Sequence, residues 1–280
     1  MSRRKVVLTG AAGRIASLML PGLRERYELT LLDIRSTDRN GREVEGTVIA
    51  DLLDRNRDAY RHHFRGAEAV IHSALVGADQ PEEYYWAEKA NIDMAYNVYQ
   101  TSLEEGVRRV VVVSSCRATY YYERLVWAGQ LDFVTPSMKA RAESFYGWAK
   151  DAIEHLGFVF AGGRVGDRPL ENVQIRIGAP RESDVQKCEL GNMVCVRRAL
   201  GAYLSVRDLV QLIVKSIETE DIRDEFGVPF QIFYGISGNA HRFWSIANAR
   251  RVIGYEPEDD SQVRFADELL AHIRAAEKGE

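Results

Sequence analysis

A tyrosine and a lysine lie four residues apart in the segment Tyr146-Gly147-Trp148-Ala149-Lys150. Residues with this spacing share one face of a helix, so the phenol and the ammonium group can face the same reacting molecule. The charge of Lys150 favours the deprotonated phenol oxygen, which can accept a proton from a substrate hydroxyl. The pair therefore predicts general base catalysis by Tyr146.

The tyrosine–lysine spacing alone is weak evidence, because the chain has 13 tyrosines and a second copy runs from Tyr85 to Lys89. We interpret that early copy as a solvated helix face. The later copy gains weight from Ser115, which follows the apolar run 109–114. A hydroxyl at a strand end can hold the substrate oxygen while Tyr146 exchanges its proton.

A glycine-rich turn, T-G-A-A-G-R-I-A at 9–16, follows the first apolar run. Gly10 permits the tight turn, Gly13 lets the backbone approach a pyrophosphate, and Ala16 keeps the next helix close to the strand. The helix N-terminus then presents free N–H groups to the phosphates. This context predicts a dinucleotide-binding site.

The second apolar run ends in an acid, Asp33. A carboxylate at this place accepts hydrogen bonds from the ribose hydroxyls of the adenosine and repels a 2′-phosphate. Arg14 and Arg35 weaken the argument, since either could reach a 2′-phosphate. On balance the sequence predicts NAD, preferred to NADP.

These side chains require a scaffold that brings several strand ends together. Nearly continuous apolar runs of this length are typical of strands buried on both faces of a parallel sheet. They occur at 5–9, 28–33, 47–50, 68–72, 109–114, 173–177 and 230–234. Helical patterns lie between or after them, at 14–26, 54–64, 82–105, 137–155, 206–218, 243–253 and 261–276. The alternation predicts a Rossmann-type, doubly wound α/β fold.

The chain is expected to form one continuous structural unit with two parts. Residues 1–172 would form the NAD-binding core with the catalytic serine, tyrosine and lysine. Residues 173–280 would complete the sheet and form a small substrate-binding part. Segments 157–170 and 180–198 have weak periodicity, and we expect them to be loops over the carboxyl edge of the sheet, where such folds bind ligands.

Composition excludes other classes of protein. The 280 residues are 46% hydrophobic and 28% charged with a net charge of −4, which gives no electrostatic reason to expect nucleic acid. Since no apolar run reaches about 18 residues, no membrane span is expected. The cysteines Cys116, Cys188 and Cys195 match no zinc spacing, so we expect no metal site. We expect their thiols to be reduced and the protein to be cytoplasmic.

The motifs together resemble the extended short-chain dehydrogenase/reductase superfamily, also called the NAD-dependent epimerase/dehydratase superfamily. The resemblance rests on TGAAGRIA, Asp33, Asn91, VVVSS and YGWAK, and it covers nearly the whole chain. RIG at 176–178, YLSVRDL at 203–209 and the stretch from YGISGN to FWSIANARRVIGYEPED resemble the uronate dehydrogenase group, including archaeal NAD-dependent glucose-6-phosphate dehydrogenases. This implies oxidation of the anomeric hydroxyl of a small sugar to a lactone, with hydride transfer to NAD.

The resemblance also implies roles for individual residues. Ser115 would hold the substrate hydroxyl, Tyr146 would be the base, and Lys150 would bind the nicotinamide ribose. The expected dinucleotide-binding residues are Gly10, Gly13, Arg14, Ile15, Asp33, Ile34, Arg35, Asp51, Leu52, Ser73, Ala74, Leu75, Asn91, Val113, Tyr146, Lys150 and Ile177. The expected substrate-binding residues are Gly77, Ser115, Cys116, Arg117, Tyr146 and Arg198.

The substrate-facing positions depart from the group's pattern. Cys116 and Arg117 stand where uronate dehydrogenases have asparagine and histidine, and Gly77 and Ala179 replace substrate-contacting serines. Arg198 falls where those enzymes place the arginine that pairs with the substrate carboxylate. Arg117 and Arg198 would form a cationic wall, which predicts an anionic sugar such as a uronate or a sugar phosphate.

Two other functions remain open at this point. One is a nucleotide-sugar epimerase or dehydratase, against which the short C-terminal part argues. The other is a non-catalytic NAD-sensing regulator, which retention of Ser115, Tyr146 and Lys150 disfavours. By the same resemblance we expect a homodimer built on helices 82–105 and 137–155, with Tyr85, Ile92, Tyr96 and Tyr99 as its apolar positions on the first helix.

Overall fold

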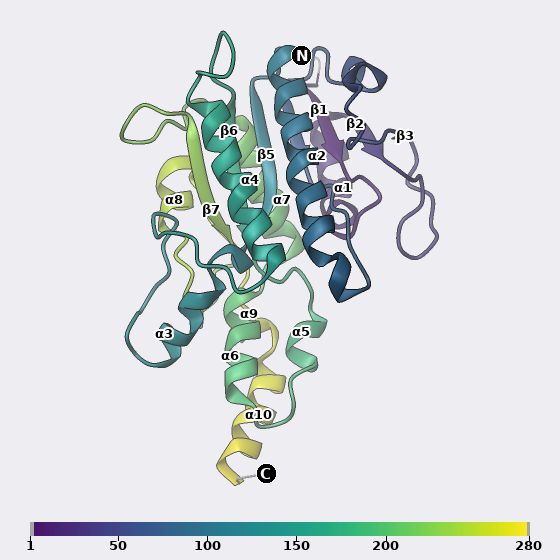
Figure 1. The fold of residues 1–280 in the computed structure, drawn as a ribbon. Coiled ribbons are helices and arrows are strands. Elements are labelled where there is room, and N and C mark those ends of the chain that lie inside the picture. Colours follow the sequence, from purple (N-terminus) through teal and green to yellow (C-terminus); the bar gives the residue numbers. More distant parts are fainter. Residues whose placement is uncertain (1–2, 279–280) are drawn as a thin grey trace.

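Seven parallel strands form one sheet in the order β3-β2-β1-β4-β5-β6-β7 (Figure 1). The computed structural model describes residues 3–278. The strands are β1 (Lys5–Thr9), β2 (Glu28–Asp33), β3 (Thr47–Ile49), β4 (Ala69–His72), β5 (Arg109–Ser115), β6 (Glu171–Ile177) and β7 (Phe230–Gly235). The order reverses beside β1, so the carboxyl ends of β1 and β4 border a crevice, which is the Rossmann arrangement. The predicted fold class is confirmed.

Helices cover both faces of the sheet. On one face α1 (Arg14–Arg26) packs against α7 (Val206–Glu218), and on the other α2 (Tyr84–Glu104) packs against α4 (Phe145–Ala161), as Figure 1 shows. Along β1, Val6 and Leu8 join the core beneath α1 and α7, while Val7 joins the core beneath α2 and α4. Burial of alternate residues on opposite faces explains the continuous apolar runs in the sequence.

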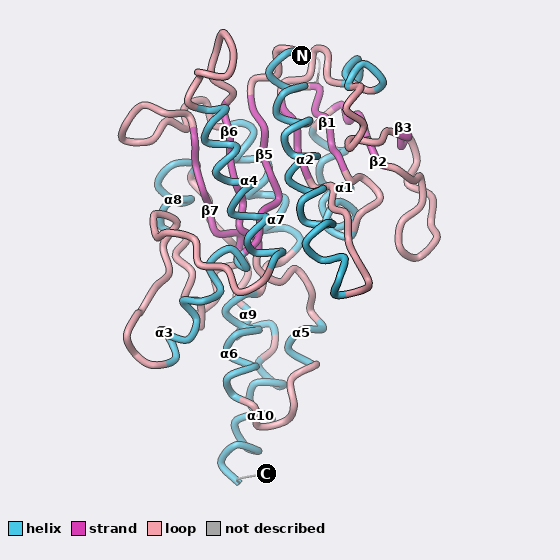
Figure 2. The backbone as a smooth tube through the Cα atoms, in the orientation of Figure 1, coloured by secondary structure: helices cyan, strands magenta, loops and turns pink. Residues whose placement is uncertain are grey.

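A small group of helices extends beyond the carboxyl ends of the strands (Figure 2). It consists of α5 (Ser183–Gln186), α6 (Met193–Ala202), α9 (Ser261–Arg264) and α10 (Ala266–Lys278). Val185, Val196, Leu200 and Phe265 form its own apolar core. We call these four helices the helical lobe. The other elements are η1 (Arg57–Ala59), η2 (Arg61–His63), η3 (Pro81–Glu83), η4 (Cys116–Tyr122), α3 (Glu123–Trp127) and α8 (Ala247–Ile253).

Several predicted boundaries are wrong. Segment 180–198, expected to be a loop, contains α5 and most of α6, whose first turn is capped by the Asn192 side chain. Segment 54–64 forms two short 3₁₀ turns in place of a helix. Helix α4 begins only at Phe145, where the Ser144 hydroxyl accepts a hydrogen bond from the Gly147 N–H, and it continues to Ala161. Of segment 157–170, only the part after Ala161 is a loop. It leads into the first residue of β6, so it lies at the amino edge of the sheet and not at the expected carboxyl edge.

Two of the three cysteines are not reduced thiols. Cys188 and Cys195 form a disulfide across the turn between α5 and α6, with Cα atoms 5.7 Å apart. This separation is within the usual range for a disulfide, although the sequence spacing gave no sign of it. Cys116 is free and buried, as expected. No helix within residues 3–278 is long and apolar enough to cross a bilayer.

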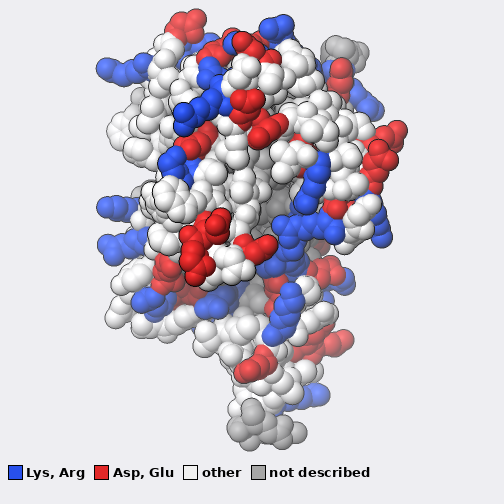
Figure 3. Space-filling model, turned by 45° about the vertical axis from the view of Figure 1, so that its right-hand side comes forward, with Lys and Arg blue, Asp and Glu red and all other residues white. Residues whose placement is uncertain are grey.

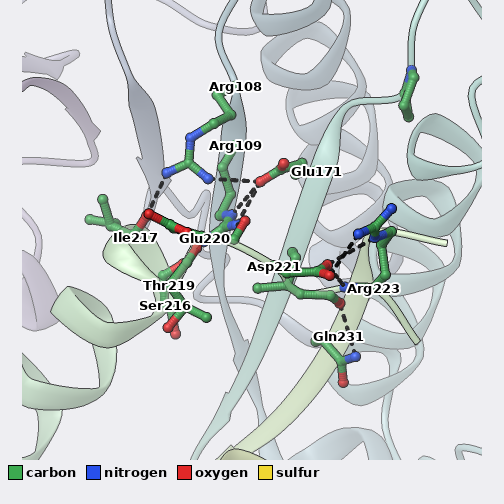
Figure 4. A network of polar contacts seen from close by, with 12 residues as sticks. Arg108, Arg109, Glu171, Ser216, Ile217, Thr219, Glu220, Asp221, Arg223 and Gln231 are labelled. Atoms are coloured by element: carbon green, nitrogen blue, oxygen red, sulfur yellow. Dashed lines mark hydrogen bonds and ion pairs between the residues drawn. The ribbon is translucent and has the colours of Figure 1, made fainter. Parts of the chain in front are cut away.

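Two consecutive arginines, of which Arg109 is buried, hold the amino edge of the sheet (Figure 4). The fully buried Arg109 bonds to Glu171 at 2.7 Å and donates to the carbonyl groups of Ser216 and Thr219, each at 2.7 Å, at the C-terminus of α7. Arg108 donates to Glu171 as well, at 2.8 Å. Because these bonds satisfy the free carbonyl groups of a helix end, they hold β5, β6 and α7 together.

Candidate active site

The turn after β1 is shaped for close approach of a ligand. Gly10 has a φ of +69°, and a Cβ there would lie 2.5 Å from the backbone N of Ala74, which follows β4. A Cβ on Gly13 would lie 2.9 Å from the carbonyl oxygen of Gly10. Gly13 is also the N-cap of α1 and supplies no side-chain cap, so the first N–H groups of this helix are free to bind phosphate.

Asp33 lies directly beside this turn. Its carboxylate accepts hydrogen bonds from the backbone N–H of Ala12 at 2.9 Å and of Arg35 at 3.3 Å. These two bonds fix the acid at the end of β2, next to the phosphate-binding backbone, which is the position that suits a ribose diol.

The loop after β4 is held by Asn91 from helix α2. Its side-chain oxygen accepts from the Val76 N–H at 2.7 Å, and its amide donates to the Val76 carbonyl at 3.0 Å. Asn91 is 3% exposed, so its effect on a dinucleotide would pass through this loop. Within the described residues, the buried Ser73 hydroxyl in the same loop has no hydrogen-bond partner, which leaves it available to a ligand.

Two packing contacts bring the catalytic candidates together. Ser115 ends β5, and its hydroxyl accepts a hydrogen bond from the Arg117 N–H at 3.2 Å. A Cβ on Gly147 would collide with the carbonyl oxygen of Arg117, so the first turn of α4 packs against the backbone just after Ser115. Tyr146 is therefore held next to Ser115, and both line the same pocket.

Lys150 lies one turn further along α4. Its ammonium group donates to the Val113 carbonyl at 3.0 Å and lies 5.6 Å from the centroid of the Tyr146 ring. The lysine is 7% exposed, so its position is fixed by packing and by this hydrogen bond. The expected sharing of one helix face is confirmed.

His72, at the end of β4, is fully enclosed behind this site. Its ring nitrogen Nδ1 lies 2.8 Å from the Thr9 hydroxyl. Burial, and secondarily the charge of Lys150, lowers the pKa of His72 to about 3. The imidazole is neutral near pH 7 and acts as a packed polar residue of the sheet.

One pocket of about 470 Å³ lies between the carboxyl ends of the strands and the helical lobe. Of the expected site residues, it is lined by Arg14, Ile15, Ser73, Leu75, Val113, Ser115, Cys116, Arg117, Tyr146, Lys150, Ile177 and Arg198. The nicotinamide half of the predicted dinucleotide site and most of the predicted substrate site are thus in one place.

Other expected residues lie outside this pocket. Gly10, Gly13, Asp33, Ile34, Arg35, Asp51 and Leu52 surround the ends of β1, β2 and β3, where the adenosine half would lie; Ile34 is 69% exposed there. Gly77 is exposed and does not line the pocket. The Cys116 thiol donates to the Arg176 carbonyl at 3.2 Å, so only the remainder of this residue can face a substrate.

The pocket also has walls that the sequence did not indicate. Segment 180–198, which was expected to be a loop, supplies Arg181, Lys187 and Cys195. The only sequence signal for their role was the predicted place of this segment at the carboxyl edge. Trp244 and Tyr120 contribute stacked aromatic rings, with centroids 6.1 Å apart. They lie more than a hundred residues apart in the chain, and no local pattern links them.

Comparison with known proteins agrees with the geometry. The chain is 28% identical over 260 residues to a uronate dehydrogenase of Pseudomonas syringae pv. tomato, covering 92% of this chain and 83% of that protein. It is 29% identical over 267 residues to an NAD-dependent glucose-6-phosphate dehydrogenase of Haloferax volcanii, covering 91% and 94%. A solved structure of a mutated uronate dehydrogenase superposes with a TM-score of 0.74 at 26% identity, covering 95% and 86%. The resemblance predicted from the sequence is confirmed.

The glycine turn, the strand ends and the start of α4 all lie within one matched region. The NAD(P)H-binding family matches residues 10–156, more than half of the sequence. The chain therefore belongs to the NAD(P)H-binding family.

Proposed function

We propose that this protein is an NAD-dependent dehydrogenase that oxidises the anomeric hydroxyl of a small anionic sugar to a lactone. The observation that carries the proposal is the meeting of Ser115, Tyr146 and Lys150 in one pocket, next to a glycine turn built to approach a pyrophosphate. The relatives named above act on uronates and on a sugar phosphate by their names, which supports a sugar substrate.

The residues present fit a dinucleotide. The backbone of Gly10 and Gly13 leaves no room for side chains, the N-terminus of α1 has free N–H groups, and the Ser73 hydroxyl is buried without a partner among the described residues. Asp33 would hold the adenosine ribose, and Lys150 the nicotinamide ribose. When bound, NAD supplies the hydride acceptor.

The chain's own residues would move the proton. Ser115 donates a hydrogen bond to the substrate hydroxyl oxygen and orients it toward Tyr146. The phenol oxygen of Tyr146, as phenolate, accepts the hydroxyl proton while a hydride leaves the carbon that bears this hydroxyl. The ammonium group of Lys150 favours that phenolate through its positive charge. General base catalysis of this kind contributes about 10²–10⁴-fold to the rate.

The two parts of the chain would divide the work. Residues 1–172 would bind NAD and supply the catalytic side chains, while residues 173–280 would supply Arg181, Lys187 and Arg198 to the substrate side. A cytoplasmic location stays a prediction, and the disulfide between Cys188 and Cys195 does not favour it, since reducing compartments seldom retain such bonds.

The deciding experiment compares Tyr146→Phe with Tyr85→Phe. Both changes remove one phenol oxygen from a tyrosine–lysine pair, but Tyr85 lies on α2, 40% exposed and outside the pocket. A screen of aldoses, uronates and sugar phosphates by NADH absorbance first identifies the substrate. Y146F should then lower kcat by about 10²–10⁴-fold with NAD binding retained, and Y85F should leave it unchanged. Near wild-type turnover by Y146F would contradict the proposal.

A further inference from the structure

The pocket at the carboxyl edge is strongly cationic, although the whole chain has a net charge of −4. Seven of its lining residues are lysine or arginine, and Asp184 is the one acid among them. Figure 3 shows lysine and arginine side chains gathered along the hollow between the sheet and the helical lobe. A local excess of one sign in a cleft attracts ligands of the opposite sign.

Arg198 is one of these lining residues, and it is paired with an acid. Its Nε donates to the Glu123 carboxylate at 2.5 Å, and that carboxylate, 6% exposed, also accepts from the Trp127 indole at 2.7 Å. This ion pair offsets part of the positive charge of Arg198, whose side chain is 42% exposed. Arg198 thus lines the pocket as an ion-paired arginine, which makes it a weaker anchor for an anion than an unpaired cation.

Arg181 is also paired, with Asp184 at 3.1 Å. Arg117 and Lys187, by contrast, have no acidic side chain within ion-pair distance in residues 3–278, and both are exposed. Arg117 lies two residues after Ser115, and its guanidinium stacks over the Tyr120 ring at 4.8 Å. The stacking orients the cation without neutralising it.

We propose that Arg117, together with Lys187, forms a phosphate-binding subsite, so that the substrate is a phosphorylated sugar. The subsite rests on the proposed function and deepens it. Asp184 and Glu123 each neutralise one cation, and the pyrophosphate of a bound dinucleotide neutralises two more, yet positive charge still remains in the pocket. A singly charged carboxylate would compensate this excess only in part. A phosphate dianion, with three acceptor oxygens, suits two cations from separate elements.

The test uses full-length variants with one charge removed from each. Arg117→Gln should raise the KM for the phosphorylated substrate about 10- to 150-fold, the effect of losing one charge-assisted hydrogen bond, and leave the neutral parent sugar unaffected. Arg124→Gln is the matched control, because Arg124 is an exposed arginine that pairs with Glu143 away from the pocket. It should behave as wild type with both sugars.

Binding of inorganic phosphate tests the subsite without turnover. In the presence of NAD, titration calorimetry should show phosphate binding to the wild-type protein, with at least tenfold weaker binding to R117Q and to Lys187→Gln. Equal binding by wild type and R117Q would overturn the subsite even if the protein oxidises sugars. Binding that depends on Arg117 would support it even if the proposed lactone-forming reaction fails. If Arg198→Gln raises the KM for the phosphorylated sugar alone and R117Q leaves it unchanged, the anion-binding role belongs to Arg198.

Discussion

Glu154 and Arg176 form a buried ion pair, with Nη2 of the arginine 2.6 Å from Oε2 of the glutamate, behind the strand end that carries Ser115. The Ser114 hydroxyl donates to the same carboxylate at 2.6 Å, and Arg176 donates to the Tyr234 hydroxyl at 3.1 Å. The network links α4, β5, β6 and β7. It therefore fixes the two elements on which Tyr146 and Ser115 lie.

Breaking this pair should destabilise the fold. Glu154→Gln keeps the size of the side chain but leaves the Arg176 guanidinium, 2% exposed, without its counter-charge. Loss of one partner from a buried pair costs about 3–5 kcal/mol. The free energy of unfolding from urea titration should fall by that amount. The double variant Glu154→Leu/Arg176→Met, which buries no charge, should lose much less, and an equal loss in both would show that packing is what matters there.

His72 should make stability depend on pH. Because its pKa is about 3 in the folded protein and near 6.5 in the unfolded chain, only the unfolded chain binds the proton between these values. Stability is then lost as the pH falls below about 6.5, at up to ~1.4 kcal/mol per pH unit. Between pH 7.5 and pH 5, urea unfolding of wild type should therefore lose ~2 kcal/mol more than that of His72→Asn. Parallel losses in the two proteins would assign the pH dependence to other groups.

The sheet could be predicted from the sequence because each buried parallel strand is a short apolar run with a turn signal at each end. The glycine turn and Asp33 were predictable for the same reason, since their roles depend on position relative to a strand. The start of α4 was not, because Ser137 and Ser144 are both suitable helix caps. The structure uses Ser144, where Gly147 packs against the Arg117 carbonyl group.

The substrate side could not be predicted in the same way. The pairing of Arg198 with Glu123 joins residues 75 apart in sequence, and it changes the arginine from an unpaired cation to an ion-paired one. A resemblance transfers the position of such a residue but not its partner. The helices of segment 180–198 are also short, and the disulfide and the Asn192 cap that hold them are not visible as a periodic pattern in the sequence.

Asp33 should determine the choice of dinucleotide. Its carboxylate is fixed by Ala12 and Arg35, so it cannot turn away from a 2′-phosphate without losing both hydrogen bonds. Asp33→Asn removes the charge and keeps one of the two accepting oxygens, which can retain the shorter bond from the Ala12 N–H. The ratio of Kd for NADP to Kd for NAD should fall by at least about tenfold, since like charges in contact cost several kcal/mol. Fluorescence titration of both dinucleotides measures this ratio. An unchanged ratio would assign selectivity to Arg14, Arg35 or Arg39.

The paired helices α2 and α4 carry an exposed aromatic stripe. Tyr85 stacks on Trp148 with centroids 5.8 Å apart and contacts Phe145 edge-on, and Trp86 is 63% exposed beside them. Of the positions first expected to be at an interface, Tyr99 is fully buried, so that position is wrong. Ile92 is partly buried against the core, and Tyr85 and Tyr96 are exposed. An exposed stripe of this kind is typical of a protein–protein contact.

We therefore expect a homodimer in which α2 and α4 of each copy form a four-helix contact. Trp86→Ala should weaken dimerisation by at least ~2 kcal/mol, about 30-fold in Kd, because large aromatic side chains dominate such interfaces. Sedimentation equilibrium at micromolar concentration measures the monomer and dimer populations. The control is Phe226→Ala, since Phe226 is 82% exposed in the turn before β7 and lies on neither helix. A monomeric wild type, or equal weakening by the two variants, would remove α2 and α4 as the interface.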